Sequence, residues 1–181
     1  MGPNLQKQVK ARKFKTIPHV VLMGLDSSGK STLLYRLQRG VIMETTPTIG
    51  FNVVTLELNK KTMLTVWDVG GQERLRSNWK HYLDGCKVLV FVIDASDRSR
   101  AEEAKIALKT ILSDHNMEDI PLMVLANKTD VPNAMELNEV CQKLDLASCT
   151  ERVWEIQTCS ALKGQGLQQA FLTVAKLVQK Q

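Results

Sequence analysis

The chain has 181 residues and carries 24 Lys and Arg against 19 Asp and Glu, a formal net charge of +5. This length is enough for one compact domain with a substantial core. No stretch approaches the roughly 18–20 consecutive apolar residues that span a bilayer, and the N-terminus lacks the apolar segment of a secretory signal. Composition therefore argues against an integral membrane protein and against a secreted one.

The positive charge is concentrated at the N-terminus. Five basic residues lie within the first fifteen positions with no acid among them, so the rest of the chain is neutral. A neutral body argues against a nucleic-acid partner. A basic segment on a neutral domain instead predicts contact with an anionic surface, and the alternative is a solvated tail without a binding role. The five residues are Lys7, Lys10, Arg12, Lys13 and Lys15.

The four cysteines and three histidines show no spacing typical of a metal site or of a catalytic triad. Cys86, Cys141 and Cys159 lie in or beside apolar runs, as expected of reduced and buried thiols. Because reduced cysteines are typical of the cytosol, we expect a cytoplasmic protein.

Short apolar runs alternate with helical patterns, which is typical of an α/β domain with a parallel sheet. The second and third runs flank residues 59–62, which is hairpin spacing, so one edge of the sheet should be antiparallel. The six predicted strands are 20–23, 53–58, 63–67, 88–93, 122–126 and 153–156.

Apolar residues at helical spacing predict helices after the first, fourth, fifth and sixth strands. Ser99 and Glu102 have the spacing of a capping box, which predicts where the second of these helices begins. We expect residues 17–181 to form the folded domain and residues 1–16 to form a basic, weakly amphipathic segment that faces a membrane.

Residues 24–31 contain the two glycines, the lysine and the hydroxyl of a phosphate-binding loop. Gly24 and Gly29 allow the backbone to turn its N–H groups toward a polyphosphate. Lys30 would then contact the β- and γ-phosphates, and the hydroxyl of Ser31 would coordinate Mg²⁺. The octet lies between a predicted strand and a predicted helix, as this motif requires. The other residues expected at the nucleotide are Leu25, Asp26, Ser27 and Ser28.

Asn127, Lys128 and Asp130 follow the fifth predicted strand, at the end where open α/β sheets bind ligands. The Asp130 carboxylate can accept hydrogen bonds from the ring N1–H and the 2-amino group of guanine, whereas adenine has no such pair of donors. The segment therefore predicts guanine recognition, and the alternative is a helix-capping turn. Residues 158–161 follow the last strand, and their small side chains allow backbone N–H groups to contact the guanine carbonyl; Cys159 and Ser160 are the residues expected at the nucleotide.

Two further segments could respond to a γ-phosphate. Asp68 can reach Mg²⁺ through a water, Gly71 lets the backbone approach the phosphate, and Gln72 can orient a water for in-line attack. Between the first helix and the hairpin, Thr45 is expected near the nucleotide and Thr48 is the preferred ligand for the remaining magnesium position. The alternative for the first segment is a simple Gly-Gly turn after an edge strand.

Together these segments resemble the ADP-ribosylation factor and ARF-like family of small GTPases, within the Ras superfamily. The resemblance covers essentially the whole chain, and residues 24–31, 47–53, 67–73, 127–130 and 158–160 carry it. It implies a P-loop NTPase fold with a six-stranded, mostly parallel sheet, one antiparallel edge hairpin and helices on both faces. It also implies a monomer that binds GTP or GDP with Mg²⁺ and hydrolyses GTP slowly.

The resemblance implies further roles by position. Thr32 should contact the α-phosphate, the Gly71 N–H the γ-phosphate, and Lys128 should stack along the base. Three residues match the family's aromatic effector patch, although core packing would explain them equally well. These residues are Phe51, Trp67 and Tyr82.

The family's partners are an exchange factor, effector proteins and a GAP, whose arginine can accelerate hydrolysis by about 10³–10⁵. Its members associate reversibly with intracellular or plasma membranes, in vesicle trafficking or signalling, through a myristoylated Gly2. Here Pro3 follows Gly2, and Gln6 stands where Ser or Thr is preferred. The chain also has Thr129 where Gln is usual, and a hairpin loop that is one residue longer.

Two other classes of function compete with a GTPase switch. A P-loop phosphotransferase would need a second substrate site and a lid, for which the chain has no spare segment. A nucleotide-holding interaction protein with negligible hydrolysis is the closer alternative, although Gln72 argues against it.

Overall fold

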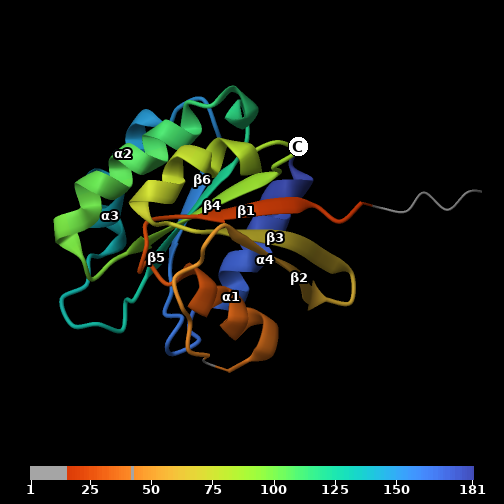
Figure 1. Ribbon diagram of the computed structural model, residues 1–181, viewed down its shortest axis with the longest axis horizontal. Helices are drawn as coiled ribbons and strands as arrows, with labels where there is room; N and C mark the ends of the chain where they lie inside the picture. Colours follow the sequence, from red (N-terminus) through yellow and green to blue (C-terminus); the bar gives the residue numbers. More distant parts are fainter. Residues whose placement is uncertain (1–15, 42) are drawn as a thin grey trace, which may run out of the picture.

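The computed structural model describes residues 16–41 and 43–181 (Figure 1). Its strands are β1 (His19–Met23), β2 (Phe51–Asn59), β3 (Thr62–Val69), β4 (Val88–Asp94), β5 (Leu122–Asn127) and β6 (Trp154–Thr158). They form one six-stranded sheet in the order β2-β3-β1-β4-β5-β6. Only β2 and β3 pair antiparallel, which confirms the predicted mostly parallel sheet with an antiparallel edge hairpin.

The inner strands are buried on both faces. All four residues from Val20 to Met23 have no exposed surface, and the same holds from Leu122 to Ala126. Parallel strands covered on both sides read as continuous apolar runs, which is why these runs could be recognised in the sequence. The edge strand β2 alternates instead, with Val54 and Leu56 buried and Val53 exposed, so the outer face of the hairpin meets solvent.

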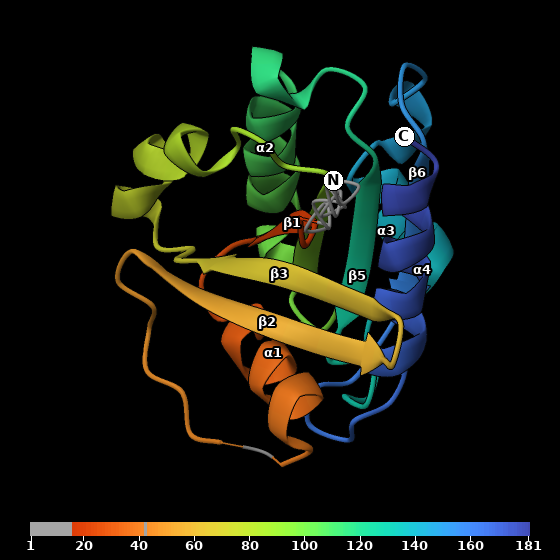
Figure 2. The ribbon, with the colours of Figure 1, turned by 90° about the vertical axis from the view of Figure 1, so that its right-hand side faces the viewer.

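Helices cover the sheet on both faces, as predicted (Figures 1 and 2). One apolar cluster joins the sheet to α1 and α4, with Phe171 at its centre, and a second joins it to α2 and α3. The bounds are α1 (Lys30–Arg39), α2 (Ala101–Leu112), α3 (Leu137–Lys143) and α4 (Leu167–Gln179).

A ten-residue 3₁₀ helix, Glu73–Tyr82, follows β3 and was not predicted. Its sequence is mostly charged and polar, and Trp79 is its one buried residue, so it has no apolar periodicity to reveal it. The Trp79 indole N–H donates to the carbonyl oxygen of Gly70 at 2.9 Å, which fixes the helix to the end of β3.

The capping-box prediction at Ser99 is wrong. A 3₁₀ turn, Arg98–Arg100, precedes α2, which begins at Ala101 without a side-chain cap. The Ser99 hydroxyl donates to the Asp97 carboxylate at 2.5 Å and is therefore engaged within the turn.

The hairpin between β2 and β3 closes more tightly than the sequence suggested. Asn59 pairs with Thr62, so only Lys60 and Lys61 form the loop. Pairing steps from Glu57 directly to Asn59, which leaves Leu58 as a β-bulge within β2.

The carboxyl ends of the parallel strands lie at one end of the sheet, where the predicted binding loops meet. The chain is first described at Thr16, near the amino ends of these strands. There the Thr65 N–H of the hairpin donates to the Pro18 carbonyl at 2.9 Å. No helix in the described part of the chain is long and apolar enough to cross a membrane. Gly2 and the basic segment 1–15 lie outside the described residues.

Candidate nucleotide-binding site

A cleft of about 380 Å³ opens at the carboxyl ends of β1 and β3. Its walls are the loop before α1, the start of α1, the segment that precedes β2 and the glycines that follow β3. Most of the predicted phosphate, magnesium and hydrolysis residues line it, namely Asp26, Ser27, Gly29, Lys30, Ser31, Thr32, Thr45, Thr48, Gly71, Gln72 and Lys128.

The phosphate loop has the shape that its glycines predict. Gly29 has a left-handed φ of 93°, and a β-carbon there would lie 2.4 Å from the Asn127 amide nitrogen, so a side chain would be strained and would collide. Lys30 is only 6% exposed, and its ammonium donates to the carbonyl oxygens of Gly24 at 3.0 Å and Leu25 at 2.8 Å. Burial lowers the pKa of Lys30 to about 8, and the carboxylate of Asp68 opposes this shift. A polyphosphate would supply the negative charge that this buried ammonium needs.

Three oxygen-bearing side chains converge beside Lys30. The Ser31 hydroxyl lies 2.9 Å from the Thr48 hydroxyl and donates to Asp68 Oδ2 at 2.5 Å. Asp68 is 1% exposed, and its Oδ1 is buried without a hydrogen-bond partner among the described residues. Burial raises the pKa of Asp68, and the bond from Ser31 opposes this shift. Hard oxygen ligands and an unsatisfied buried carboxylate oxygen fit Mg²⁺ or a water bound to it.

Gly71 brings the segment after β3 into direct contact with the phosphate loop. A β-carbon at this position would lie 2.3 Å from the Gly24 carbonyl oxygen, so no side chain fits there. The Asp26 N–H donates to the Gly71 carbonyl at 3.1 Å. Gln72 follows at the mouth of the cleft, where its side-chain oxygen accepts a hydrogen bond from Arg74 at 3.2 Å.

The last residue of β5 and the first residue of the loop after it are each bonded to the phosphate loop. The Asn127 amide donates to the Ser28 carbonyl at 2.9 Å. Lys128 donates to the Ser27 carbonyl at 2.7 Å and pairs with the Asp94 carboxylate at 2.7 Å. Ser27 and Lys128 both have left-handed backbones, with φ of 61° and 65°, a conformation that non-glycine residues adopt only where their surroundings enforce it.

Two of the predicted base-recognition residues are in direct contact. The Ser160 hydroxyl donates to the Asp130 carboxylate at 2.6 Å and so orients it. The N–H groups of Cys159 and Ser160 donate, at 2.9 Å each, to the carbonyl oxygens of Ala126 in β5 and of Gln165. The contact between residues 158–161 and the guanine carbonyl stays a prediction.

Sequence reasoning missed an ion cluster at the rear of the phosphate loop. Arg76 and Arg100 approach the Asp26 carboxylate to 3.3 Å and 2.8 Å, and they approach Glu103 to 2.8 Å and 2.9 Å. Hydrogen bonds from Arg100 and then Arg76 lower the pKa of Glu103 to about 2, and the bond from Arg100 also lowers the pKa of Asp26. Arg100 and Glu103 have the i,i+3 spacing of a helical ion pair, but no sequence signal connects them to Asp26 or to Arg76.

The predicted aromatic patch forms on the hairpin side of the molecule. Phe51 stacks on Trp67 with ring centroids 4.9 Å apart, and it meets Tyr82 at 5.3 Å. Trp67 and Tyr82 also pack against the core, as the alternative of core packing requires. Phe51 is 45% exposed, as a residue that binds an effector would be. His19 extends the row, since its ring lies 5.0 Å from Trp67.

A phosphate loop between β1 and α1, together with an asparagine at the end of β5 and an aspartate in the loop that follows, defines a P-loop protein of the small-GTPase class. The model of the ADP-ribosylation factor family matches residues 4–178. The chain therefore belongs to the ADP-ribosylation factor family of small GTPases, which are GTP-binding switches.

Similar proteins agree with this assignment. ADP-ribosylation factors J and K of Dictyostelium discoideum are each 44% identical over 156 residues, which cover 86% of this chain and 82% of each relative. The solved structure of the Arl6 BBS3 small GTPase from Trypanosoma brucei, with the bound nucleotide analogue GppNp, superposes with a TM-score of 0.84 at 29% identity. It covers 92% of this chain and 99% of its own. The fold is thus that of an ARF-like small GTPase.

The ion cluster predicts a specific acid sensitivity. Because the folded-state pKa of Glu103 lies near 2, below its ordinary 4.5, its contribution to stability is present above pH 4.5 and is lost as the pH falls toward 2. The difference in urea midpoint between wild type and Glu103→Gln should therefore shrink over this range. The exposed Glu57→Gln serves as the matched control, and a difference for Glu103→Gln that is independent of pH would contradict the prediction.

Proposed function

We propose that the cleft binds GTP and GDP with Mg²⁺ and that the protein is a slow GTPase switch that recruits effectors at a membrane surface. The convergence of Ser31, Thr48 and Asp68 beside the buried ammonium of Lys30 is the observation that carries this proposal. One cleft thereby offers a cation site and a polyphosphate site side by side. Family membership supports guanine nucleotides as its ligands.

Ser31 and Thr48 would hold Mg²⁺ through their hydroxyls, and Asp68 would act through a water. The ion would neutralise charge on the β- and γ-phosphates during transfer. Lys30 would exchange its two carbonyl partners in the loop for phosphate oxygens, because its charge is otherwise balanced only by dipoles and distant carboxylates. Thr32 and Thr45, whose hydroxyls lie 3.3 Å apart at the cleft, would contact the nucleotide on its solvent side.

Base selection would depend on Asp130. Its carboxylate is held by Ser160, and Asn127 fixes the loop that carries it. The stem of Lys128 lines the cleft and would lie along the base. Thr129, where the family usually has Gln, donates to the Cys159 carbonyl at 2.9 Å and so belongs to the framework of the loop, not to the base site.

The first test is the choice of base. Fluorescent GTP bound to the protein should be displaced by GDP but not by ATP. In Asp130→Asn, guanine-nucleotide affinity should fall by about 10- to 100-fold, because a charge-assisted pair of hydrogen bonds is lost. Asp119→Asn, in an exposed turn with a left-handed backbone that Asn tolerates, is the matched control and should bind as wild type does. Displacement by ATP as efficient as by GDP would reject this function and favour a phosphotransferase.

Hydrolysis would depend on Gln72 and on an arginine from outside. Gln72 lies at the cleft and can swing from Arg74 to a water near the γ-phosphate. Among the described residues, no arginine lines the cleft, and Arg76 is held by carboxylates behind the loop. This arrangement supports the proposal that intrinsic turnover is slow and that a GAP accelerates it.

The second test separates a GTPase from a protein that only holds nucleotide. Phosphate release should be slow in the wild type and should rise with a GAP of the ADP-ribosylation factor family. In Gln72→Leu this stimulated rate should drop by at least about 100-fold with little change in GTP affinity, since Gln72 acts on the attacking water. Gln169→Leu, an exposed glutamine of α4, should behave as wild type. Equal stimulated rates in Gln72→Leu and wild type would remove Gln72 from the mechanism, and absent release in wild type would favour the nucleotide-holding alternative.

Effectors would bind the aromatic patch of Phe51, Trp67 and Tyr82, which adjoins both phosphate-responsive segments. Phe51 begins β2 directly after the Thr48 segment, and Tyr82 ends the 3₁₀ helix that follows Gln72. Movement of either segment would therefore change the shape of the patch. Exchange factors and a GAP are the other partners implied by family membership.

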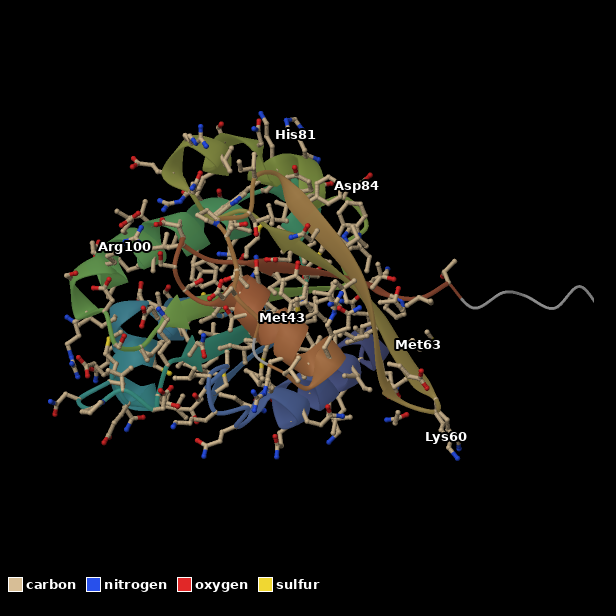
Figure 3. All side chains as sticks on the ribbon, turned by 60° about the horizontal axis from the view of Figure 1, so that its bottom comes forward. Met43, Lys60, Met63, His81, Asp84 and Arg100 are labelled. Atoms are coloured by element: carbon tan, nitrogen blue, oxygen red, sulfur yellow. The ribbon has the colours of Figure 1, made fainter. Side chains whose placement is uncertain are left out.

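Membrane association would involve residues 1–16, with residues 17–181 as the GTPase domain. The described chain begins beside the hairpin, at the edge of the sheet opposite the cleft, and Lys60 projects from the hairpin tip (Figure 3). The first described residues and the two hairpin lysines, Lys60 and Lys61, thus lie at the same end of the sheet. One myristoyl chain gives a binding constant near ~10⁴ M⁻¹, and each basic residue near an anionic leaflet adds about 1 kcal/mol, so both would be needed for stable attachment.

The third test uses anionic vesicles and protein expressed with an N-myristoyltransferase. Wild type should co-sediment with the vesicles, and Gly2→Ala should lose most of this binding because basic residues alone are screened by salt. Vesicles of neutral lipid serve as the control for charge. If Gly2→Ala binds as well as the parent protein, lipidation has no part in the attachment and only the charge contribution remains.

A further inference from the structure

Four charged side chains meet behind the phosphate loop. Asp26 comes from the loop itself and also lines the nucleotide cleft, and Arg76 comes from the 3₁₀ helix after β3. Arg100 comes from the 3₁₀ turn before α2, and Glu103 from the first turn of α2. Both arginines contact both carboxylates, at 2.8–3.3 Å. The cluster therefore joins the phosphate loop, the γ-phosphate-responsive segment and a fixed helix.

Arg76 occupies a special position in this cluster because it also binds backbone. Its Nε donates to the carbonyl oxygen of Gly71 at 3.0 Å, while its Nη2 contacts Asp26 and Glu103. The same Gly71 oxygen accepts the N–H of Asp26. One planar guanidinium thus spans the glycine backbone and two carboxylates with donors held in a fixed, spread geometry, whereas a lysine ammonium has its three donors on a single nitrogen.

Arg100 holds the other side of Asp26. Its Nη1 donates to the Asp26 carbonyl at 3.1 Å and its Nη2 to the carboxylate at 2.8 Å. Figure 3 shows Arg100 on the side of the molecule away from the hairpin tip at Lys60. Since Arg100 directly precedes α2, it anchors the phosphate loop to a helix packed against the sheet.

Ordinary surface ion pairs contribute little, with typical values of about 0–1 kcal/mol. This cluster differs in geometry and in burial. The Arg76 side chain is only 16% exposed and has three acceptors, and each carboxylate serves two arginines. Such an arrangement fixes positions even where its net contribution to stability is small.

We propose that Asp26, Arg76, Arg100 and Glu103 form a latch that holds Gly71 against the phosphate loop, with Arg76 as the positioning residue for the contact between the Gly71 N–H and a γ-phosphate. This inference rests on the proposed function, since it concerns how the same cleft distinguishes GTP from GDP. Only the triphosphate can use the contact at Gly71. Opening the latch should therefore weaken GTP binding while GDP binding stays nearly unchanged.

The test compares affinities for a non-hydrolysable GTP analogue and for GDP in wild type, Arg76→Gln and Arg76→Lys. The preference for the analogue over GDP should fall by about five- to tenfold in both variants, a modest allosteric coupling. Hydrogen exchange of the amides of residues 70–82 should speed up in both variants with the analogue bound. Arg98→Gln is the matched control, because it breaks an even shorter arginine–carboxylate pair, with Glu139 at 2.6 Å, that joins the 3₁₀ turn before α2 to α3.

Loss of preference with faster exchange in the Arg76 variants, and neither change in Arg98→Gln, would establish the latch. An unchanged preference, an equal loss for both nucleotides, or full retention by Arg76→Lys would overturn it. If the wild type itself shows no preference for guanine over adenine nucleotides, the proposed function fails. Hydrogen exchange of the nucleotide-free wild type and Arg76 variants then decides whether Arg76 holds residues 70–82 in place.

Discussion

The buried side chain of Asn127 is the constraint on which the arrangement of the site depends. It is 1% exposed, its amide nitrogen donates to the Ser28 carbonyl, and its oxygen accepts the Ala161 N–H at 3.0 Å. A buried amide must satisfy both its donor and its acceptor, so the loops after β1, β5 and β6 can take only positions that do so together. The parallel sheet brings these three loops to one edge, and Asn127 then fixes their spacing.

The phosphate side of the cleft follows a different principle, namely close approach of backbone to backbone. Gly29 and Gly71 lie where a β-carbon would collide with Asn127 or with the carbonyl of Gly24. Charged groups are then placed around this compact frame, with Lys30 buried inside it and the ion cluster of Asp26 behind it. The hydrogen bonds of Asn127 hold the loops on the base side in fixed positions, whereas the glycines on the phosphate side allow close backbone contacts. This combination suits a protein that holds the nucleotide base in one place and responds to the terminal phosphate.

The sequence predicted those parts of the molecule that have a local signal. The buried strands, the phosphate loop, the edge hairpin and the residues lining the cleft could be recognised because periodicity and motif spacing reflect burial and backbone turns directly. The 3₁₀ helix Glu73–Tyr82 has one buried residue and left no such pattern.

Contacts between distant segments could not be predicted in this way. Arg76 and Asp26 are separated by 50 positions and Arg100 and Asp26 by 74, and any of the chain's many charged residues could have filled these places. The partners of the N–H groups after β6 could not be predicted for a related reason. Small residues permit backbone contacts with a ligand, but they also permit hydrogen bonds to the neighbouring strand and within the turn.

Strand β3 connects the hairpin loop at one end of the sheet to the candidate cation site at the other end. It starts at the hairpin turn with Lys60 and Lys61 and carries Asp68, of the candidate cation site, near its other end. An extended strand is stiff along its axis, so any sliding of the hairpin would displace both ends by the same distance. A shift of two residues keeps every side chain on its own face and corresponds to roughly 7 Å of travel. Such a shift would couple the two ends of β3: the position of the hairpin loop would then depend on whether the Asp68 carboxylate is held in the cation site or released from it.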